Sequence, residues 1–302
     1  MLHILLPTFN RASLLRETLS SLRAQDADPS SWHLTVVDNA STDETRKLLE
    51  ETIATWSNFD YQVNDRNIGL FGNLNRCMDL ARSRKYMILH SDDIVSPQLV
   101  SSVQTFLSRN PQVDMSFGSC KAMIEETGEI LDFWYKSRLI SGEERVLQQG
   151  SLATALICSG TNFIFAPTVV YDREFFDPSM RYSTELEYAA DLDLWFRAAM
   201  RAPLVGYIPG PLITCRIHAD RLSSRYSDTM RREVIGVVRK HLRNMRAFPE
   251  LHSVNNRTIS VVEAKLRLFE LAIRMKLVPG FKMRRGIATL FERAAQISMR
   301  KY

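Results

Sequence analysis

The sequence contains few cysteines and no long apolar run. Its 302 residues include four cysteines, which stand far apart with no Cys-x-x-Cys pair and no histidine at zinc spacing. A disulfide framework and a structural zinc site are therefore not expected, and a reducing cytoplasm fits best. No stretch reaches the roughly 18 apolar residues that cross a bilayer. Because Met1 leads into a strand-like segment without a signal-peptide pattern, we expect a cytoplasmic location.

Two phosphate-binding motifs are also missing. The sequence contains neither G-x-G-x-x-G nor G-x-x-x-x-G-K-[ST]. The first absence argues against a dinucleotide-dependent dehydrogenase, and the second argues against an NTPase that holds phosphates in a glycine-rich loop. Any phosphate group must therefore be held in another way.

Charge is distributed unevenly along the chain. Residues 230–302 carry 17 Lys and Arg against five Asp and Glu, whereas residues 1–229 carry 22 against 29, and the whole chain has a net charge of +5. Nucleic acid, an acidic protein or anionic lipid headgroups would all attract such a basic segment. Solvated surface helices would have the same composition, so both interpretations stay open.

Strand and helix patterns alternate in the first 110 residues. Short apolar runs predict strands, and apolar residues at three- and four-residue spacing predict amphipathic helices. The predicted strands cover residues 2–6, 34–37, 61–63 and 86–89, and the predicted helices cover 13–25, 42–54 and 71–81. Ser96 before Pro97 predicts the start of a helix that ends near Arg109. This alternation predicts an α/β fold with a mostly parallel sheet flanked by helices.

The pattern is less regular after residue 110. Strands are predicted at residues 115–124, 163–171, 205–208 and 212–216, with a turn at 126–129 and a helix beginning near Asp191. From residue 230 the chain reads as helical, with a second helix at 258–276, a break at Pro279-Gly280 and a last helix to about residue 300. These features predict a mixed α/β segment followed by a C-terminal helical extension.

Polar residues follow each of the first four predicted strands. They are Pro7-Thr8-Phe9-Asn10-Arg11, Asp38 to Asp43, Asn64 to Gly69, and His90-Ser91-Asp92-Asp93. Ligands of such sheets bind outside the carboxyl ends of the strands. Asp92-Asp93 forms a hard oxygen site that suits Mg²⁺ or Mn²⁺, with a substrate diphosphate completing the shell. An isolated Asp-Asp pair is more often a helix cap, but its place after an apolar strand favours the metal.

These segments resemble the successive signatures of family-2 glycosyltransferases of the GT-A fold. The resemblance covers roughly residues 2–220 and rests on Ile4 to Arg11, Val36 to Asp43, Asn67-Ile68-Gly69 with Gly72-Asn73, and Asp92-Asp93 followed by Pro97. It implies a GT-A catalytic domain at residues 1–229, divided into a nucleotide-binding half at 1–110 and an acceptor-binding half at 111–229. The basic helical extension then covers residues 230–302.

The resemblance also implies roles for individual residues. Thr8 and Asp38 would contact the nucleotide base, Asp92 the ribose and Asp93 the Mn²⁺ or Mg²⁺ ion. The other residues expected to bind the donor in these loops are Pro7, Asn10, Arg11 and Asn67. An aspartate suits a base such as uracil because a carboxylate can accept the ring N–H. His90 stands where many members have an aspartate, so it either contacts the donor or caps the strand, and it bears on donor preference.

Two later segments complete the resemblance. Asp191 to Arg197 is similar to the family's Glu-Asp-x-Asp-Leu-Trp-Leu-Arg helix start, which makes Asp191 the expected catalytic base, although Ala190 replaces the usual glutamate. Both aspartates could instead favour a helix N-terminus, and Asp193 is expected to be structural. Cys215 to His218 with Ser223 resembles Tyr-Arg-x-His-x-x-x-x-Ser. It makes His218 a candidate for the metal or the diphosphate and Arg216 a candidate for the diphosphate.

The resemblance therefore implies an inverting glycosyltransferase of bacterial surface polysaccharide or glycolipid assembly. The favoured donor is a UDP-sugar, the acceptor is a glycan or lipid-linked saccharide, and no nucleic acid partner is expected. The basic extension would contact the inner face of the membrane peripherally or form a homodimer. Two alternatives remain: a sugar-1-phosphate nucleotidyltransferase, whose glycine-rich basic loop is absent here, and a non-catalytic nucleotide-sugar-binding protein.

Overall fold

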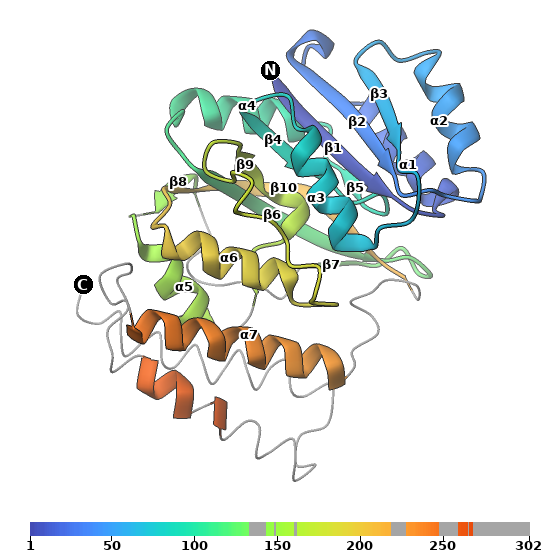
Figure 1. Ribbon diagram of the computed structural model, residues 1–302. Coiled ribbons are helices and arrows are strands. Elements are labelled where there is room, and N and C mark those ends of the chain that lie inside the picture. Colours follow the sequence, from blue (N-terminus) through green and yellow to red (C-terminus); the bar gives the residue numbers. More distant parts are fainter. Residues whose placement is uncertain are drawn as a thin grey trace. The chain divides into compact units, whose positions relative to one another are not determined.

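The computed structural model describes residues 1–132, 143–147, 149–159, 162–218, 228–247, 259–264 and 266–267. Two compact units make up the chain. The first consists of Met1–Val146, Ile164–Glu185 and Leu204–Arg225, and the second consists of Leu147–Phe163, Leu186–Pro203 and Tyr226–Tyr302. The sheet of the first unit and the helices of the second are visible in Figure 1.

The first unit is built on a mixed sheet with a parallel half formed by β1–β4. β1 (Leu2–Thr8), β2 (Trp32–Asp38), β3 (Phe59–Val63) and β4 (Lys85–Ile88) run parallel in the order β3-β2-β1-β4. They alternate with α1 (Ala12–Arg23), the short η1 (Pro29–Ser31), α2 (Thr45–Ile53) and α3 (Leu70–Leu80), and α4 (Leu99–Arg109) follows. The strands and helices predicted for the first 110 residues are confirmed, except that α4 begins at Leu99, after Gln98 as its N-cap, and not at Pro97.

The other half of the sheet is mostly antiparallel. β9 (Val170–Asp172) pairs with β4, β6 (Met115–Ile124) pairs with β9, and both pairings are antiparallel. β10 (Val205–Ile217) runs parallel to β6, and β5 (Ile94–Val95) lies antiparallel at its edge. β7 (Ile130–Asp132) pairs with β6, and β8 (Arg145–Leu147) pairs with β10.

The predicted strands differ from the structure in two places. The segment 163–171 was expected to be one strand, but η2 (Ala166–Thr168) occupies its middle and β9 begins only at Val170. Pro167 explains the difference, because proline fixes φ and has no N–H for a strand ladder. The strands predicted at 205–208 and 212–216 are one strand, β10, with an irregular register between Ile208 and Ile213. Gly210, with φ of 89°, allows that irregularity.

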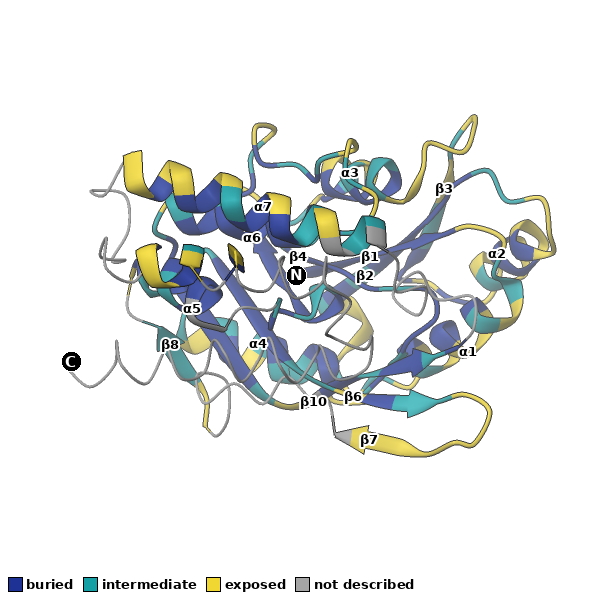
Figure 2. Cartoon of the chain, turned by 90° about the horizontal axis from the view of Figure 1, so that it is seen from below, coloured by how far each residue is buried: buried dark blue, intermediate teal, exposed yellow. Residues whose placement is uncertain are grey.

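Helices cover both faces of the parallel strands. All seven residues of β1 are buried, as expected for a strand enclosed on both sides. Its alternate residues Leu2, Ile4 and Leu6 share one core cluster with apolar residues of α1, α2 and α4. α3 contacts β1 and β2, and its buried residues lie outside that cluster, so α3 covers the opposite face. Figure 2 shows β1 and β2 as buried along most of their length.

The second unit is helical where it is described. α5 (Ser151–Ser159) and α7 (Asp228–Ala247) both contact α6 (Ala190–Met200). Val238 and Leu242 of α7 are buried, while Val234 on the same stripe is half-buried. Residues 259–264 and 266–267 are helical, while the rest of the predicted helix at 258–276 and the last predicted helix lie outside the described residues. The expected start of the extension at residue 230 falls in the first turn of α7, and its independence as a domain stays a prediction.

Within the described part of the chain, no helix is both long enough and apolar enough to span a bilayer.

Candidate functional site

The loops after β1 and β2 are joined by hydrogen bonds. The Asn10 N–H donates to Ser41 Oγ at 2.8 Å, and Asn10 Oδ1 accepts from the Thr42 N–H at 2.7 Å. Asn10 adopts a left-handed conformation with φ of 49°, which asparagine tolerates better than most residues. The two strand-end loops therefore hold each other in place at one edge of the sheet.

Thr8 and Asp38 lie side by side at that edge. They are paired in the register of β1 and β2, and both are buried. The Asp38 carboxylate accepts hydrogen bonds from Ser41 Oγ at 2.5 Å and from the Ser41 N–H at 3.2 Å. Among the described residues, Thr8 Oγ1 has no hydrogen-bond partner. The structure thus brings together the two residues expected to contact the base, and it leaves one buried hydroxyl for a ligand.

An asparagine network fixes the third loop. Asn39 Nδ2 donates to Asn67 Oδ1 at 2.8 Å, and Asn39 Oδ1 accepts from Asn64 Nδ2 at 3.0 Å. Asn64 Nδ2 also donates to Asn73 Oδ1 at 2.9 Å, and Asn73 Nδ2 donates to the Val37 carbonyl at 3.0 Å. Sequence reasoning missed Asn39, although its place directly after Asp38 could have indicated it. Asn67 lies within this network, and its contact with the donor stays a prediction.

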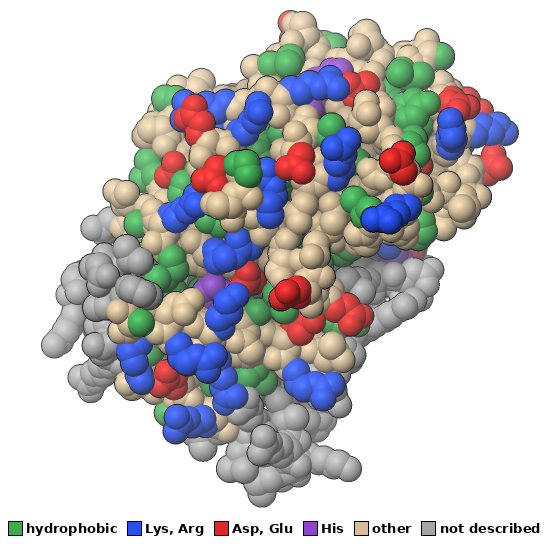
Figure 3. Space-filling model, in the orientation of Figure 1, with side chains coloured by type: hydrophobic (Ala, Val, Ile, Leu, Met, Phe, Trp, Pro, Cys, Tyr) green, Lys and Arg blue, Asp and Glu red, His purple; other side chains and the backbone are tan. Residues whose placement is uncertain are grey.

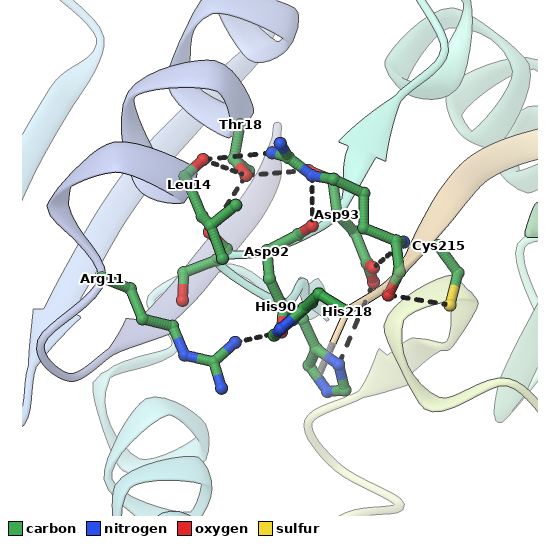
Figure 4. A network of polar contacts seen from close by, with 10 residues as sticks. Arg11, Leu14, Thr18, His90, Asp92, Asp93, Cys215 and His218 are labelled. Carbon is green, nitrogen blue, oxygen red and sulfur yellow. Dashed lines mark hydrogen bonds and ion pairs between the residues drawn. The ribbon is translucent and has the colours of Figure 1, made fainter. Parts of the chain in front are cut away.

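Asp92 stands between the side chains of an arginine and a histidine. Arg11 forms an ion pair with Asp92 Oδ2 through Nη1, and His218 Nε2 lies 3.2 Å from the same oxygen. The three residues come from the loop after β1, the loop after β4 and the end of β10, as Figure 4 shows. The sequence-predicted residues Arg11, Asp92 and His218 are therefore in direct contact.

Asp93 is the more deeply buried of the two aspartates. Its side chain is 2% exposed, its Oδ1 accepts the Arg216 N–H at 3.3 Å, and its Oδ2 lies 4.0 Å from His90 Nδ1. The backbone of this loop is held by Thr18 of α1, whose Oγ1 donates to the Asp93 carbonyl at 2.8 Å. Asp93 therefore stands on a rigid turn.

Arg216 is turned toward α1. Its buried guanidinium donates from Nε to the Asp92 carbonyl at 2.7 Å, from Nη1 to Glu17 Oε2 at 2.5 Å and from Nη2 to the Leu14 carbonyl at 3.2 Å. These contacts give Arg216 a clear part in holding the Asp92 backbone. Its expected contact with a diphosphate stays a prediction.

The cluster of His90, Asp92 and Asp93 suits a divalent cation. Within the described residues, one ligand atom from each of the three lies within 4.8 Å of the others. Two carboxylates provide the oxygen ligands that Mg²⁺ and Mn²⁺ prefer. The donor set therefore fits the metal that the resemblance implies, and the role of Asp93 as its ligand stays a prediction.

Asp191 lies in the second unit, in the first turn of α6. Its Oδ2 accepts a 2.6 Å hydrogen bond from Asn162 Nδ2, and its Oδ1 accepts from the Leu192 N–H at 2.7 Å. Burial raises the pKa of Asp191 to about 6, because the hydrogen bonds that favour the ionised form do not offset the lost solvation. A carboxylate with this pKa can accept a proton near neutral pH.

Asp193 has a different environment two residues further on. It is buried and accepts hydrogen bonds from Arg197 Nε at 2.7 Å, His241 Nε2 at 2.9 Å and Lys240 Nζ at 3.1 Å. Burial alone would raise the pKa of Asp193, but these three donors outweigh it and hold the pKa well below its ordinary range. Asp193 therefore stays ionised and links α6 to α7.

A family comparison identifies the class of protein. The profile described as "Glycosyl transferase family 2" matches residues 3–174, more than half of the chain. The chain belongs to this family. It is a glycosyltransferase, which confirms the predicted enzyme class over the nucleotidyltransferase and the non-catalytic binding protein.

Curated relatives of this glycosyltransferase carry similar names. An uncharacterized glycosyltransferase of Haemophilus influenzae is 21% identical over 228 residues, which cover 75% of this chain and 68% of the relative. The abequosyltransferase RfbV of Salmonella typhimurium is 31% identical over 113 residues, which cover 36% of this chain and 33% of the relative.

Solved structures show that the glycosyltransferase has a GT-A fold. TarS of S. aureus, residues 1–349 in complex with UDP-GlcNAc, matches with a TM-score of 0.67 and 17% identity over 88% of this chain and 71% of that chain. The mannosyltransferase PcManGT of Pyrobaculum calidifontis, in complex with GDP-Man and Mn²⁺, matches with a TM-score of 0.58 and 17% identity over 98% of this chain and 86% of that chain. The predicted fold class is confirmed.

Proposed function

We propose that this glycosyltransferase moves a sugar from a nucleotide-diphosphate donor to an acceptor hydroxyl with inversion, and that UDP-sugars are its favoured donors. The supporting observation is the arrangement at the carboxyl edge of the parallel strands. Thr8 and Asp38 lie together there, and Asp92 and Asp93 follow the neighbouring strand β4. Ligands of open α/β sheets bind at this edge. The solved neighbours named above hold UDP-GlcNAc and GDP-Man, which supports a nucleotide-sugar donor.

Each residue of the strand-end loops has a proposed part in donor binding. Thr8 and Asp38 hold the base, Asp92 contacts the ribose, and Pro7, Asn10, Arg11 and Asn67 complete the surface around the nucleotide. Arg216 contributes positive charge near the diphosphate. Asp93 and His218 would hold Mn²⁺ or Mg²⁺, which when bound neutralises charge on the departing diphosphate. The Mn²⁺ in the PcManGT structure supports a divalent cation in this fold.

Asp191 is the proposed general base. The acceptor oxygen forms a bond to the anomeric carbon while the bond from that carbon to the diphosphate oxygen breaks, and the nucleoside diphosphate leaves. The acceptor proton passes to the Asp191 carboxylate. Since its pKa is about 6, the carboxylate is mostly ionised at neutral pH and still basic enough to accept this proton. No covalent intermediate with the enzyme is needed.

The acceptor is proposed to be a glycan or a lipid-linked saccharide of bacterial surface polysaccharide or glycolipid assembly. The similarity to an abequosyltransferase supports sugar transfer. Lys and Arg side chains gather on the outer surface of α7, as Figure 3 shows. This surface supports peripheral contact with anionic lipid, and self-association through the C-terminal helices is the alternative.

A thermal-shift panel tests the proposal. UDP, GDP, dTDP and CMP are added to the full chain with and without Mn²⁺, since a ligand that binds only the folded state raises Tm. We expect the largest increase with UDP and Mn²⁺ together. A chain whose Tm responds to none of these nucleotides would overturn the proposed donor class.

A further inference from the structure

His90 is placed to do more than cap β4. We propose that His90 is a ligand of the divalent cation at Asp92 and Asp93, so that the site includes an imidazole nitrogen and selects Mn²⁺ over Mg²⁺. This inference rests on the proposed function, because it assumes that a metal ion binds at this edge of the sheet. It adds a ligand that neither the family match nor the neighbours assign.

The distances support a shared ion. His90 Nδ1 lies 4.0 Å from Asp93 Oδ2, and ligand atoms of His90, Asp92 and Asp93 all lie within 4.8 Å of one another. Two ligands of one ion, with bonds of about 2.2 Å, can be at most about 4.4 Å apart. The imidazole and the carboxylates therefore need only small adjustments to reach the same ion.

The exposure and packing of His90 indicate the side from which its imidazole approaches the Asp93 carboxylate. Its side chain is 33% exposed, whereas that of Asp93 is 2% exposed, so the imidazole meets the buried carboxylate from the solvent side. The ring packs edge-on against Phe165, with ring centroids 6.5 Å apart. This packing limits rotation of the ring and keeps it beside Asp93.

His218 lies beside the cluster of His90, Asp92 and Asp93 and provides a matched comparison for His90. Its Nε2 lies 3.2 Å from Asp92 Oδ2, the oxygen that also forms the ion pair with Arg11. The two histidines therefore approach different aspartates, and Figure 4 shows both beside the Asp92-Asp93 pair. Replacing them one at a time separates the nitrogen that His90 would supply to the metal from the one that His218 would supply.

The consequence for metal choice follows from ligand chemistry. Mg²⁺ is bound almost entirely by oxygen, whereas imidazole binds first-row transition metals more readily. A site with one nitrogen ligand should therefore bind Mn²⁺ more tightly than Mg²⁺. Replacing His90 by aspartate exchanges this nitrogen for oxygen, so the preference for Mn²⁺ should fall by about tenfold.

Electron spin echo envelope modulation of bound Mn²⁺ tests this assignment directly. The full chain is loaded with Mn²⁺ and UDP, and modulation from a directly bonded ¹⁴N is measured in the wild type, His90→Ala, His90→Asp and His218→Ala. We expect modulation from two bound nitrogens in the wild type and from one in each single variant, supplied by His218 in the His90 variants and by His90 in His218→Ala. Thermal melting confirms that each variant is folded, and His90→Asp provides a second test if His90→Ala is not.

The possible outcomes distinguish this inference from the proposed function. Bound Mn²⁺ whose ¹⁴N modulation is the same in the wild type and in both His90 variants, including none in any of them, would overturn the role of His90 and leave metal dependence intact. A wild-type chain that binds no Mn²⁺ in the presence of UDP would contradict the proposed metal site itself.

Discussion

Asn162 donates a 2.6 Å hydrogen bond from Nδ2 to Oδ2 of Asp191, the carboxylate that we propose as the general base. Asn162 precedes Asp191 by 29 residues, and both lie in the second unit. The bond favours the ionised form of Asp191 and orients the carboxylate. Burial nevertheless dominates and raises the pKa of Asp191 to about 6.

Replacing Asp191 by asparagine should remove catalysis and leave donor binding intact. A positioned base contributes about 10²- to 10⁴-fold, so kcat of Asp191→Asn should fall by that factor. In the wild type, kcat/KM should decrease about tenfold per pH unit below pH 6, because the protonated carboxyl cannot accept the acceptor proton. Release of nucleoside diphosphate measures both effects. Unchanged acceptor-dependent turnover in Asp191→Asn would show that the base is another residue.

Replacing Asn162 should move the pH dependence in a defined direction. The Asn162→Ala variant loses a hydrogen bond that lowers the pKa of Asp191, so that pKa should rise further. The acidic limb of the kcat/KM profile should therefore shift to higher pH. A purely structural role for Asn162 would lower kcat/KM equally at every pH, and a shift to lower pH would contradict the account.

The elevated pKa of Asp191 also predicts a gain in stability when the charge is removed. The folded chain holds this proton more tightly than the unfolded chain, so the contribution of Asp191 to stability is present at low pH and is lost as pH rises toward 6. At pH 8, Asp191→Asn should be more stable than the wild type by about 1 to 2 kcal/mol, allowing for solvent screening. At pH 4 the difference should disappear. Urea unfolding of both proteins at pH 4 and pH 8 measures this difference in the free energy of unfolding.

The contribution of Asp193 to stability should depend on pH in the opposite direction to that of Asp191. Because its pKa is held below the ordinary value, its contribution to stability is present above about pH 4 and is lost as pH falls toward the folded-state pKa. Asp193→Asn takes away the buried carboxylate that Arg197, Lys240 and His241 share, and it should cost about 2 kcal/mol at pH 7. The exposed pair of Asp79 and Arg181 provides the control, and Asp79→Asn should cost less than about 1 kcal/mol. If urea unfolding shows that Asp193→Asn and Asp79→Asn lower the free energy of unfolding equally, Asp193 has no special role in stability.

Much of the fold, and the loops at the carboxyl ends of the first four strands, could be predicted because the sequence patterns that indicate them are local. Apolar runs that end in polar residues located β1 to β4 and the loops that carry Thr8, Asp38 and Asp93. Pro167 was a local signal against a continuous strand at 163–171, and the apolar run around it obscured that signal. Strand ends could therefore be predicted better than the irregular segments between later strands.

The contacts that fix the site are not local, and the sequence could not reveal them. Arg216 bonds to Glu17, 199 residues away, and this pairing turns its guanidinium toward α1. Asn162 and Asp191 meet across a segment with no recognisable motif. The place of Asn39 in its network depends on three loops that come together only in the folded chain.

The most direct test of the central claim is the dependence of UDP binding on Mn²⁺, measured by isothermal titration calorimetry with the wild type and Asp93→Ala. Since a diphosphate completes the shell of a metal held by Asp93, Mn²⁺ should tighten UDP binding to the wild type by about tenfold or more. Asp93→Ala should bind UDP equally with and without the ion. Wild-type binding that is indifferent to Mn²⁺, or an Asp93→Ala variant that retains the full effect, would contradict the account.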